Sequence, residues 1–126
     1  MLLEGSYRNE QGEQVTKIAL NDAVLNKGRF YHLVSVKIYI NNELLDQYIA
    51  DGVIVSSPTG STGYNLSAGG PIVEPSAQNI IITPLCAHAV NTKGIVTSPR
   101  IMTFLSDLQW RKHCDYEREE SFKTSS

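Results

Sequence analysis

The strongest constraint on the fold is the strict alternation of apolar and polar residues in the segment LVSVKIYI, residues 33–40. The apolar positions that share one face are Val34, Val36, Ile38 and Ile40. Because successive side chains of a β-strand point to opposite faces, this spacing predicts a strand with one face in a core. The next two residues, Asn41 and Asn42, tolerate the left-handed backbone of a tight turn. The pattern therefore predicts an antiparallel hairpin with residues 43–49.

The N-terminal segment predicts further strands. Residues 3–8 and 15–25 lie on either side of the turn-forming segment NEQGE, residues 9–13. Asn21 and Asp22 interrupt the second run, and both residue types are depleted in strand interiors. The pair therefore predicts a bulge or a polar contact that offsets this cost, or else a plain turn between two shorter strands. Together with the hairpin, these segments predict a mainly β domain that begins with three or four antiparallel strands.

Residues 52–100 have a different character, because only three of their side chains are charged. Tyr64 to Ala68 predicts one or two helical turns that end at Gly69-Gly70-Pro71. Short strands are predicted at residues 53–55, 80–82 and 94–97. A long loop with so little charge is expected to line a site or to pack against another surface.

Charge dominates the C-terminal segment, where seven of the ten residues 111–120 are charged. We therefore predict a β domain over residues 1–99, followed by a divergent charged tail over residues 100–126 that is partly disordered or helical.

Composition places the chain among globular domains and excludes several classes of partner. The 126 residues have a formal net charge of -2, so neither nucleic acid nor an anionic membrane is expected to bind. No apolar run reaches the roughly 20 residues that cross a bilayer, and a secretory signal is not expected. Cys86 and Cys114 favour free thiols over a disulfide. A cytoplasmic location follows as an expectation.

The loop TGSTGYN, residues 59–65, is the most informative stretch for chemistry. Its glycines allow backbone N–H groups to approach an anion or a hydroxylated ligand, and its hydroxyls donate or accept. Tyr64 offers a flat face for a base. The alternative interpretation is an ordinary turn with a helix cap. The segment contains neither a Walker motif nor the Gly-x-Ser-x-Gly motif of hydrolases.

Two other positions have weaker functional interpretations. Asp51 precedes a predicted strand, where its carboxylate could accept hydrogen bonds from ribose hydroxyls, although Asp-Gly is also a common turn. His88 has no second metal ligand at a suitable spacing, so a structural histidine is favoured. A thiol–imidazole nucleophile formed with Cys86 is the less favoured alternative, because no third orienting group is evident.

Three elements in this order resemble the C-terminal domain of the NAD kinase family. Residues 19–28, ALNDAVLNKG, are similar to that family's Ala/Val-Leu-Asn-Glu/Asp element. Residues 51–73, DGVIVSSPTGSTGYNLSAGGPIV, resemble its Asp-Gly and Thr-Gly-Ser-Thr-Ala/Gly-Tyr motif. Residues 82–96, ITPLCAHAVNTKGIV, are similar to its Thr-Pro-Ile-Cys-Pro-His segment. The resemblance extends over residues 1–99 and implies an antiparallel β-sandwich of this family's type, incomplete, with one short helix after TGSTGY.

The resemblance implies a kinase that transfers the γ-phosphoryl group of ATP, or of polyphosphate, to the 2′-hydroxyl of the adenosine ribose of NAD, giving NADP. It also implies Mg²⁺ or another divalent cation with ATP, and a homo-oligomer. The residues implied to bind NAD are Asn21, Asp22, Asp51, Thr62, Gly63, Tyr64, Ser67 and Ala89. Asn21 and Asp22 would bind adenine and ribose groups, Asp51 a ribose or nicotinamide-side group, and the others would line the dinucleotide groove.

The chain also departs from the family pattern. The Gly-Gly-Asp-Gly-Thr motif, implied to supply the catalytic aspartate and to cradle phosphates, does not occur in the sequence. We therefore predict the dinucleotide-binding part of an NAD kinase, without kinase activity of its own. The alternatives are a non-catalytic NAD(P)-binding or interaction module and a lipid kinase of the diacylglycerol or sphingosine type.

Overall fold

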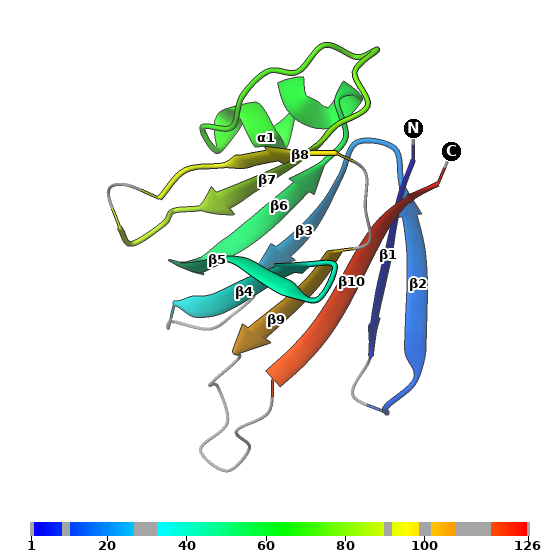
Figure 1. Cartoon of the computed structure of the whole chain (residues 1–126), viewed down its shortest axis with the longest axis vertical. Helices are drawn as coiled ribbons and strands as arrows, with labels where there is room; N and C mark the ends of the chain where they lie inside the picture. Colours follow the sequence, from blue (N-terminus) through cyan, green and yellow to red (C-terminus); the bar gives the residue numbers. More distant parts are fainter. Residues whose placement is uncertain are drawn as a thin grey trace.

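The computed structural model of the chain describes residues 2–8, 11–26, 33–89, 92–98, 102–107 and 117–125. Within these residues the strands form two antiparallel sheets packed face to face (Figure 1). The first sheet contains, in spatial order, β2 (Gln14–Ala19), β1 (Leu2–Arg8), β10 (Glu117–Ser125), β9 (Met102–Asp107), β4 (Val34–Ile40) and β5 (Glu43–Ala50). The second contains β3 (Asp22–Asn26), β6 (Gly52–Ser56), β7 (Ile80–Leu85) and β8 (Ile95–Thr97). The predicted antiparallel β-sandwich is confirmed.

The alternating segment forms strand β4, as its period of two predicts. Val34, Val36 and Ile38 are buried. Asn41 and Asn42 have φ angles of 52° and 63°, and they join β4 to β5 in the predicted hairpin. Both residues of the turn therefore adopt the left-handed backbone that a tight two-residue hairpin needs.

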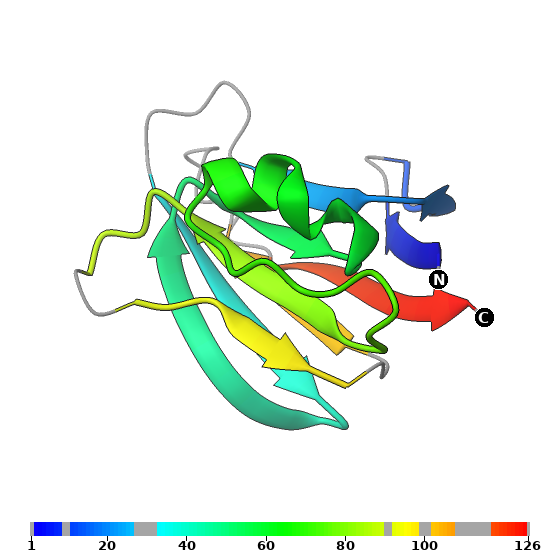
Figure 2. The same cartoon turned by 90° about the horizontal axis from the view of Figure 1, so that it is seen from above.

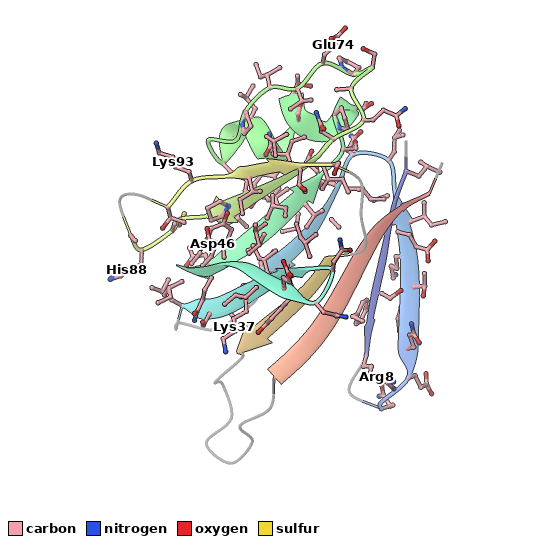
Figure 3. All side chains as sticks on the ribbon, viewed as in Figure 1. Arg8, Lys37, Asp46, Glu74, His88 and Lys93 are labelled. Atoms are coloured by element: carbon pink, nitrogen blue, oxygen red, sulfur yellow. The ribbon has the colours of Figure 1, made fainter. Side chains whose placement is uncertain are left out.

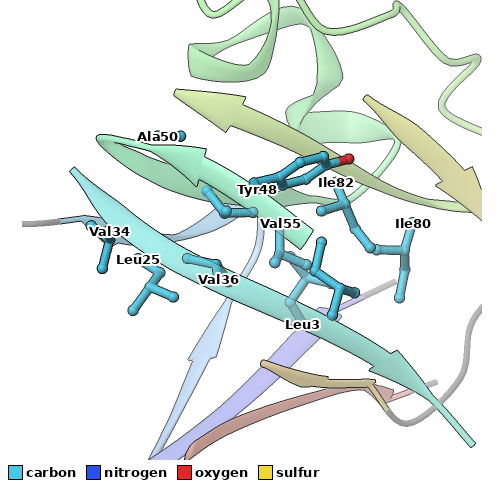
Figure 4. Close-up of a cluster of buried hydrophobic side chains, with 11 residues drawn as sticks. Leu3, Leu25, Val34, Val36, Tyr48, Ala50, Val55, Ile80 and Ile82 are labelled. Atoms are coloured by element: carbon cyan, nitrogen blue, oxygen red, sulfur yellow. The ribbon is translucent and has the colours of Figure 1, made fainter. Parts of the chain in front are cut away.

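The core lies between the two sheets, and Figure 4 shows the cluster that fills it. Its members are Leu3, Leu25, Val34, Val36, Ile38, Tyr48, Ala50, Val53, Val55, Ile80 and Ile82. Ile54 and Ile81 are equally buried but belong to the opposite face of the second sheet. Because β6 and β7 are buried on both faces, their sequences are continuous apolar runs without alternation.

Two short helical segments follow β6: the 3-10 turn η1 (Thr59–Thr62) and the helix α1 (Tyr64–Ser67). Figures 1 and 2 show them against the face of the second sheet that points away from the first sheet. The predicted helical turn after TGSTGY is thus confirmed. In the described part of the chain, no helix has the length and apolar character of a membrane span.

The structure decides between the two interpretations of Asn21 and Asp22. Strand β2 belongs to the first sheet and β3 to the second, so the chain crosses between the sheets at Leu20 and Asn21. The plain turn is therefore correct and the bulge within one strand is wrong. A strand that changes sheets must bend away from its former partner, and polar turn residues tolerate that bend.

The prediction of a disordered or helical tail is wrong for residues 102–107 and 117–125. These residues form β9 and β10, which lie in the middle of the first sheet between β1 and β4. The N–H and C=O groups along the edges of β1 and β4 can pair with an added strand whatever side chains that strand carries. The charge of this segment therefore gave a wrong prediction of its secondary structure. Cys114 and the rest of residues 108–116 lie outside the described residues.

Candidate functional site

The loop that follows β6 is seated on the crossover between β2 and β3. The Ser57 amide donates to the Asn21 carbonyl at 2.9 Å, and the Ser57 hydroxyl donates to the Leu20 carbonyl at 2.8 Å. Gly60 lies so close to Asn21 that an added Cβ would overlap the Asn21 carbonyl oxygen. Two motifs that are almost 40 residues apart in the sequence are therefore held together by backbone contacts.

A buried polar network fixes the underside of this loop. The Asn65 amide group donates to the carbonyls of Ser61 at 3.0 Å and Pro71 at 2.9 Å. Its Oδ1 accepts from the Thr83 hydroxyl at 2.5 Å. The Ser61 hydroxyl donates to the Pro58 carbonyl at 2.7 Å and accepts from the Val73 amide at 3.0 Å. Asn65 and Ser61 are fully buried, so residues 58–73 are tied to β7 from within.

Sequence reasoning did not assign roles to Asn65 and Thr83. The available signal was Thr83, the one hydroxyl-bearing residue in the otherwise apolar sequence IIITPL of β7. Its side chain lies on the face of the sheet that α1 covers, opposite Ile54 of β6. A buried hydroxyl requires a hydrogen-bond partner, but only the tertiary structure identifies Asn65 as that partner. Among the described residues, every buried side-chain nitrogen or oxygen has a hydrogen-bond partner.

The upper side of the loop faces solvent. Thr62, Gly63, Tyr64 and Ser67 are all exposed, and the Tyr64 side chain is 48% exposed. An aromatic side chain left half in solvent on a rigid support offers a stacking surface. Asn21 is also exposed, beside η1. The structure thus brings the predicted residues Asn21, Asp22 and Thr62–Ser67 to one end of β6.

The other two predicted residues, Asp51 and Ala89, lie at the opposite end of that strand. Asp51 directly precedes β6, and its amide donates to the Leu85 carbonyl at 2.8 Å. With a rise of about 3.3 Å per residue, the five residues of β6 separate its ends by roughly 13 Å. The structure therefore divides the eight predicted residues into two groups.

A cavity of about 600 Å³ lies beside the C-terminal end of α1, and of the eight predicted residues its lining includes Ala89. Its walls come from the turn after α1 and from the connection between β7 and β8, and they include Ala68, Gly69, Thr83, Cys86, Ala89 and Lys93. A second cavity of about 520 Å³ lies between β1, β2 and β3 and includes Asp22. The α1 segment therefore connects the exposed tyrosine to the cavity at Ala89.

Cys86 and His88 do not form the alternative nucleophile. Strand β7 ends at Leu85, so the two residues do not share a strand face, and both are exposed. Figure 3 shows the His88 side chain projecting away from the sheets, and its role as a structural histidine stays a prediction. Cys86 is a free thiol, as predicted. No group of three or more His, Cys, Asp or Glu side chains in the described part of the chain could hold a metal ion.

Tyr48 is the largest fully buried side chain described, and its hydroxyl donates to the Lys93 carbonyl at 2.8 Å. Burial, and secondarily the negative charge of Asp46, raise the pKa of Tyr48 well above its usual range. The folded protein therefore keeps this proton at a pH where the unfolded chain releases it.

This pKa predicts a loss of stability at alkaline pH. The stabilisation is fully present below the unfolded pKa of about 10 and is lost as the pH rises above it toward the folded pKa. We expect the free energy of unfolding, measured with urea from about pH 8 to 11, to fall less steeply in Tyr48→Phe than in the unsubstituted chain. Equal slopes would contradict the assignment.

Comparison with known proteins identifies relatives. The model of the ATP-NAD kinase C-terminal domain matches residues 20–115. An NAD kinase of Caldanaerobacter subterraneus subsp. tengcongensis is 48% identical over 99 residues, which are 79% of this chain and 35% of that enzyme. An NAD kinase of Lachnoclostridium phytofermentans is 52% identical over 80 residues, which are 64% of this chain and 28% of that enzyme. The chain therefore spans about a third of the length of these relatives.

Two solved structures share the fold. Yeast NADH kinase complexed with NADH matches with a TM-score of 0.85 and 27% identity, over 99% of this chain and 40% of that chain. An NAD kinase from Archaeoglobus fulgidus in complex with ATP matches with a TM-score of 0.75 and 27% identity, over 98% of this chain and 51% of that chain. With the sequence relatives, these matches show that the chain belongs to the ATP-NAD kinase C-terminal domain family.

Proposed function

We propose that this chain is the dinucleotide-binding part of an NAD kinase, which transfers the γ-phosphoryl group of ATP to the 2′-hydroxyl of the adenosine ribose of NAD. The supporting observation is the exposed set Thr62, Gly63, Tyr64 and Ser67, which the buried network of Asn65 and Ser61 holds in place from below. A site whose supporting residues are locked in place needs little reorganisation when a ligand binds. The related structures contain NADH and ATP, which is consistent with this ligand class.

The exposed residues have the chemistry that a base and its ribose require. Tyr64 supplies an aromatic face for stacking, and the hydroxyls of Thr62 and Ser67 can donate or accept hydrogen bonds. Asn21 and Asp22 add an amide and a carboxylate at the same end of β6. Asp51 and Ala89, at the other end, would contact a different part of the dinucleotide.

Replacing Tyr64 tests this site. Stacking of an aromatic side chain on a base contributes about 1–3 kcal/mol, so Tyr64→Ala should weaken NAD binding by roughly 5- to 150-fold. The measurement is a titration with NAD followed by amide-proton NMR. Tyr39→Ala is the matched control, because Tyr39 lies on the first sheet, away from the loop. Equal affinities of the two variants would contradict the stacking role.

Phosphoryl transfer depends on positioning and on neutralising charge around the phosphates. By the family resemblance, Mg²⁺ or another divalent cation would accompany ATP. Polyphosphate is the alternative donor. By the same resemblance, the whole enzyme would be a cytoplasmic homo-oligomer.

The chain by itself should bind NAD without phosphorylating it. We expect no NADP when the purified chain is incubated with NAD, ATP and Mg²⁺, because the Gly-Gly-Asp-Gly-Thr motif does not occur in the sequence. Detection of NADP by a coupled dehydrogenase assay would overturn this division of roles. An absence of NAD-dependent shifts in the NMR titration would instead contradict dinucleotide binding, and would favour an interaction module with another ligand.

A further inference from the structure

At one end of the sandwich, three hydrogen bonds join the end of β5 and the following residue, Asp51, to the end of β7 and the connection between β7 and β8. The Asp51 amide donates to the Leu85 carbonyl, and the His88 amide donates to the Ile49 carbonyl at 2.9 Å. The third bond is from the Tyr48 hydroxyl to the Lys93 carbonyl, across 45 residues of sequence. The first two use only backbone groups, whereas the third requires a tyrosine.

The Tyr48 hydroxyl is not needed to fill space. The ring lies in the core cluster with Ile82 (Figure 4), and phenylalanine would supply the same ring. Burying a hydroxyl has a free-energy cost unless the hydroxyl finds a partner. Its partner is the carbonyl of Lys93, whose side chain projects outward at the edge of the structure (Figure 3). The bond therefore restrains the backbone of the connection and not its side chain.

That backbone forms a wall of the 600 Å³ cavity beside α1, which includes Ala89, Thr92, Lys93 and Gly94. The Thr92 amide donates to the Ala89 carbonyl at 3.1 Å, so the restraint at Lys93 extends to Ala89 within the same short segment. A buried anchor in the first sheet therefore sets the position of a cavity wall on the second.

From this geometry we infer that Tyr48 is a positioning residue for ligand binding: its hydroxyl holds the wall formed by Ala89, Thr92, Lys93 and Gly94 in place and thereby sets the affinity of the cavity for the dinucleotide. Tyr48 itself contacts no ligand, because it is fully buried between the sheets. The identity of the ligand, a dinucleotide, rests on the proposed function. The anchoring of the cavity wall by Tyr48 rests on the hydrogen bonds alone.

The test compares Tyr48→Phe with Val36→Ala in the full chain. Val36 is the cross-strand neighbour of Tyr48 and is equally buried, so its truncation destabilises the same part of the core without removing the hydroxyl. Because one neutral hydrogen bond is lost, Tyr48→Phe should weaken NAD binding about five-fold in an NMR titration. Amide hydrogen exchange of Thr92 should also become faster. Val36→Ala should change neither quantity beyond its effect on the fraction folded.

The outcomes separate the two levels of the inference. Equal NAD affinity and equal Thr92 exchange in both variants would show that Tyr48 is only a core residue. If the unsubstituted chain binds no NAD, the proposed function fails, and with it the effect on affinity. In that case, faster amide exchange of Thr92 in Tyr48→Phe alone would still support the anchoring of the wall by Tyr48. Unchanged exchange of Thr92 would overturn the anchoring.

Discussion

Gly60→Ala is expected to displace the loop that follows β6 from its seat on the crossover between β2 and β3. An added Cβ would overlap the carbonyl oxygen of Asn21 and crowd the remaining backbone atoms of that residue. Backbone atoms cannot rotate away as the end of a flexible side chain can, so the strands β3 and β6 or the loop itself must shift. Overpacking of this kind costs about 3 kcal/mol, a large share of a stability of roughly 5–15 kcal/mol. We expect a lower urea midpoint and loss of NAD-dependent NMR shifts.

Gly63→Ala is the matched control, because it makes the same chemical change three residues away. An added Cβ at Gly63 would meet only the Gly60 carbonyl oxygen, at 3.4 Å, which is an ordinary contact. Its φ of -91° is also accessible to alanine. This variant should retain the urea midpoint of the unsubstituted chain. If the two variants were equally stable, the close packing of Gly60 on Asn21 would not determine the position of the loop.

Asn65→Asp is expected to have the second large effect, although the two side chains have nearly the same shape. The Asn65 amide nitrogen donates to two carbonyls, and a carboxylate at that position would face both of them with negative charge. An uncompensated buried charge costs about 3–5 kcal/mol. We therefore expect most of the fold's stability to be lost at neutral pH, as measured by urea unfolding.

The dependence of this effect on pH identifies its cause. Burial and the two facing carbonyls would raise the pKa of the introduced carboxyl above its unfolded value of about 4. The stability of the variant is then greatest below that value and is lost as the pH rises through the folded pKa. Gln78→Glu, which adds the same charge at an exposed position between α1 and β7, should remain stable at neutral pH. A similar loss in both variants would point to net charge and not to the buried network.

The strands with one solvent-exposed face could be predicted from their own residues. Alternation in β4 and the Asn41-Asn42 turn are local features, and local sterics determine which face of a strand and which turn they produce. The glycine- and hydroxyl-rich loop was predicted for the same reason, since its backbone freedom depends on its own residues. The helical turn from Tyr64 to Ser67 followed from its flanking glycines.

The tertiary structure alone decided the remaining features. Strands β9 and β10 complete the first sheet because the edges of β1 and β4 pair with any extended backbone, so the charged run over residues 111–120, which overlaps the start of β10, was misleading. The pairing of Thr83 with Asn65 and of Tyr48 with Lys93 joins residues that are 18 and 45 positions apart. Local sequence determines which backbone conformations are available, but only the packing of two sheets determines which distant polar groups meet. For this protein, the sequence identified the glycine- and hydroxyl-rich loop, and the packing of the two sheets determined how that loop is held.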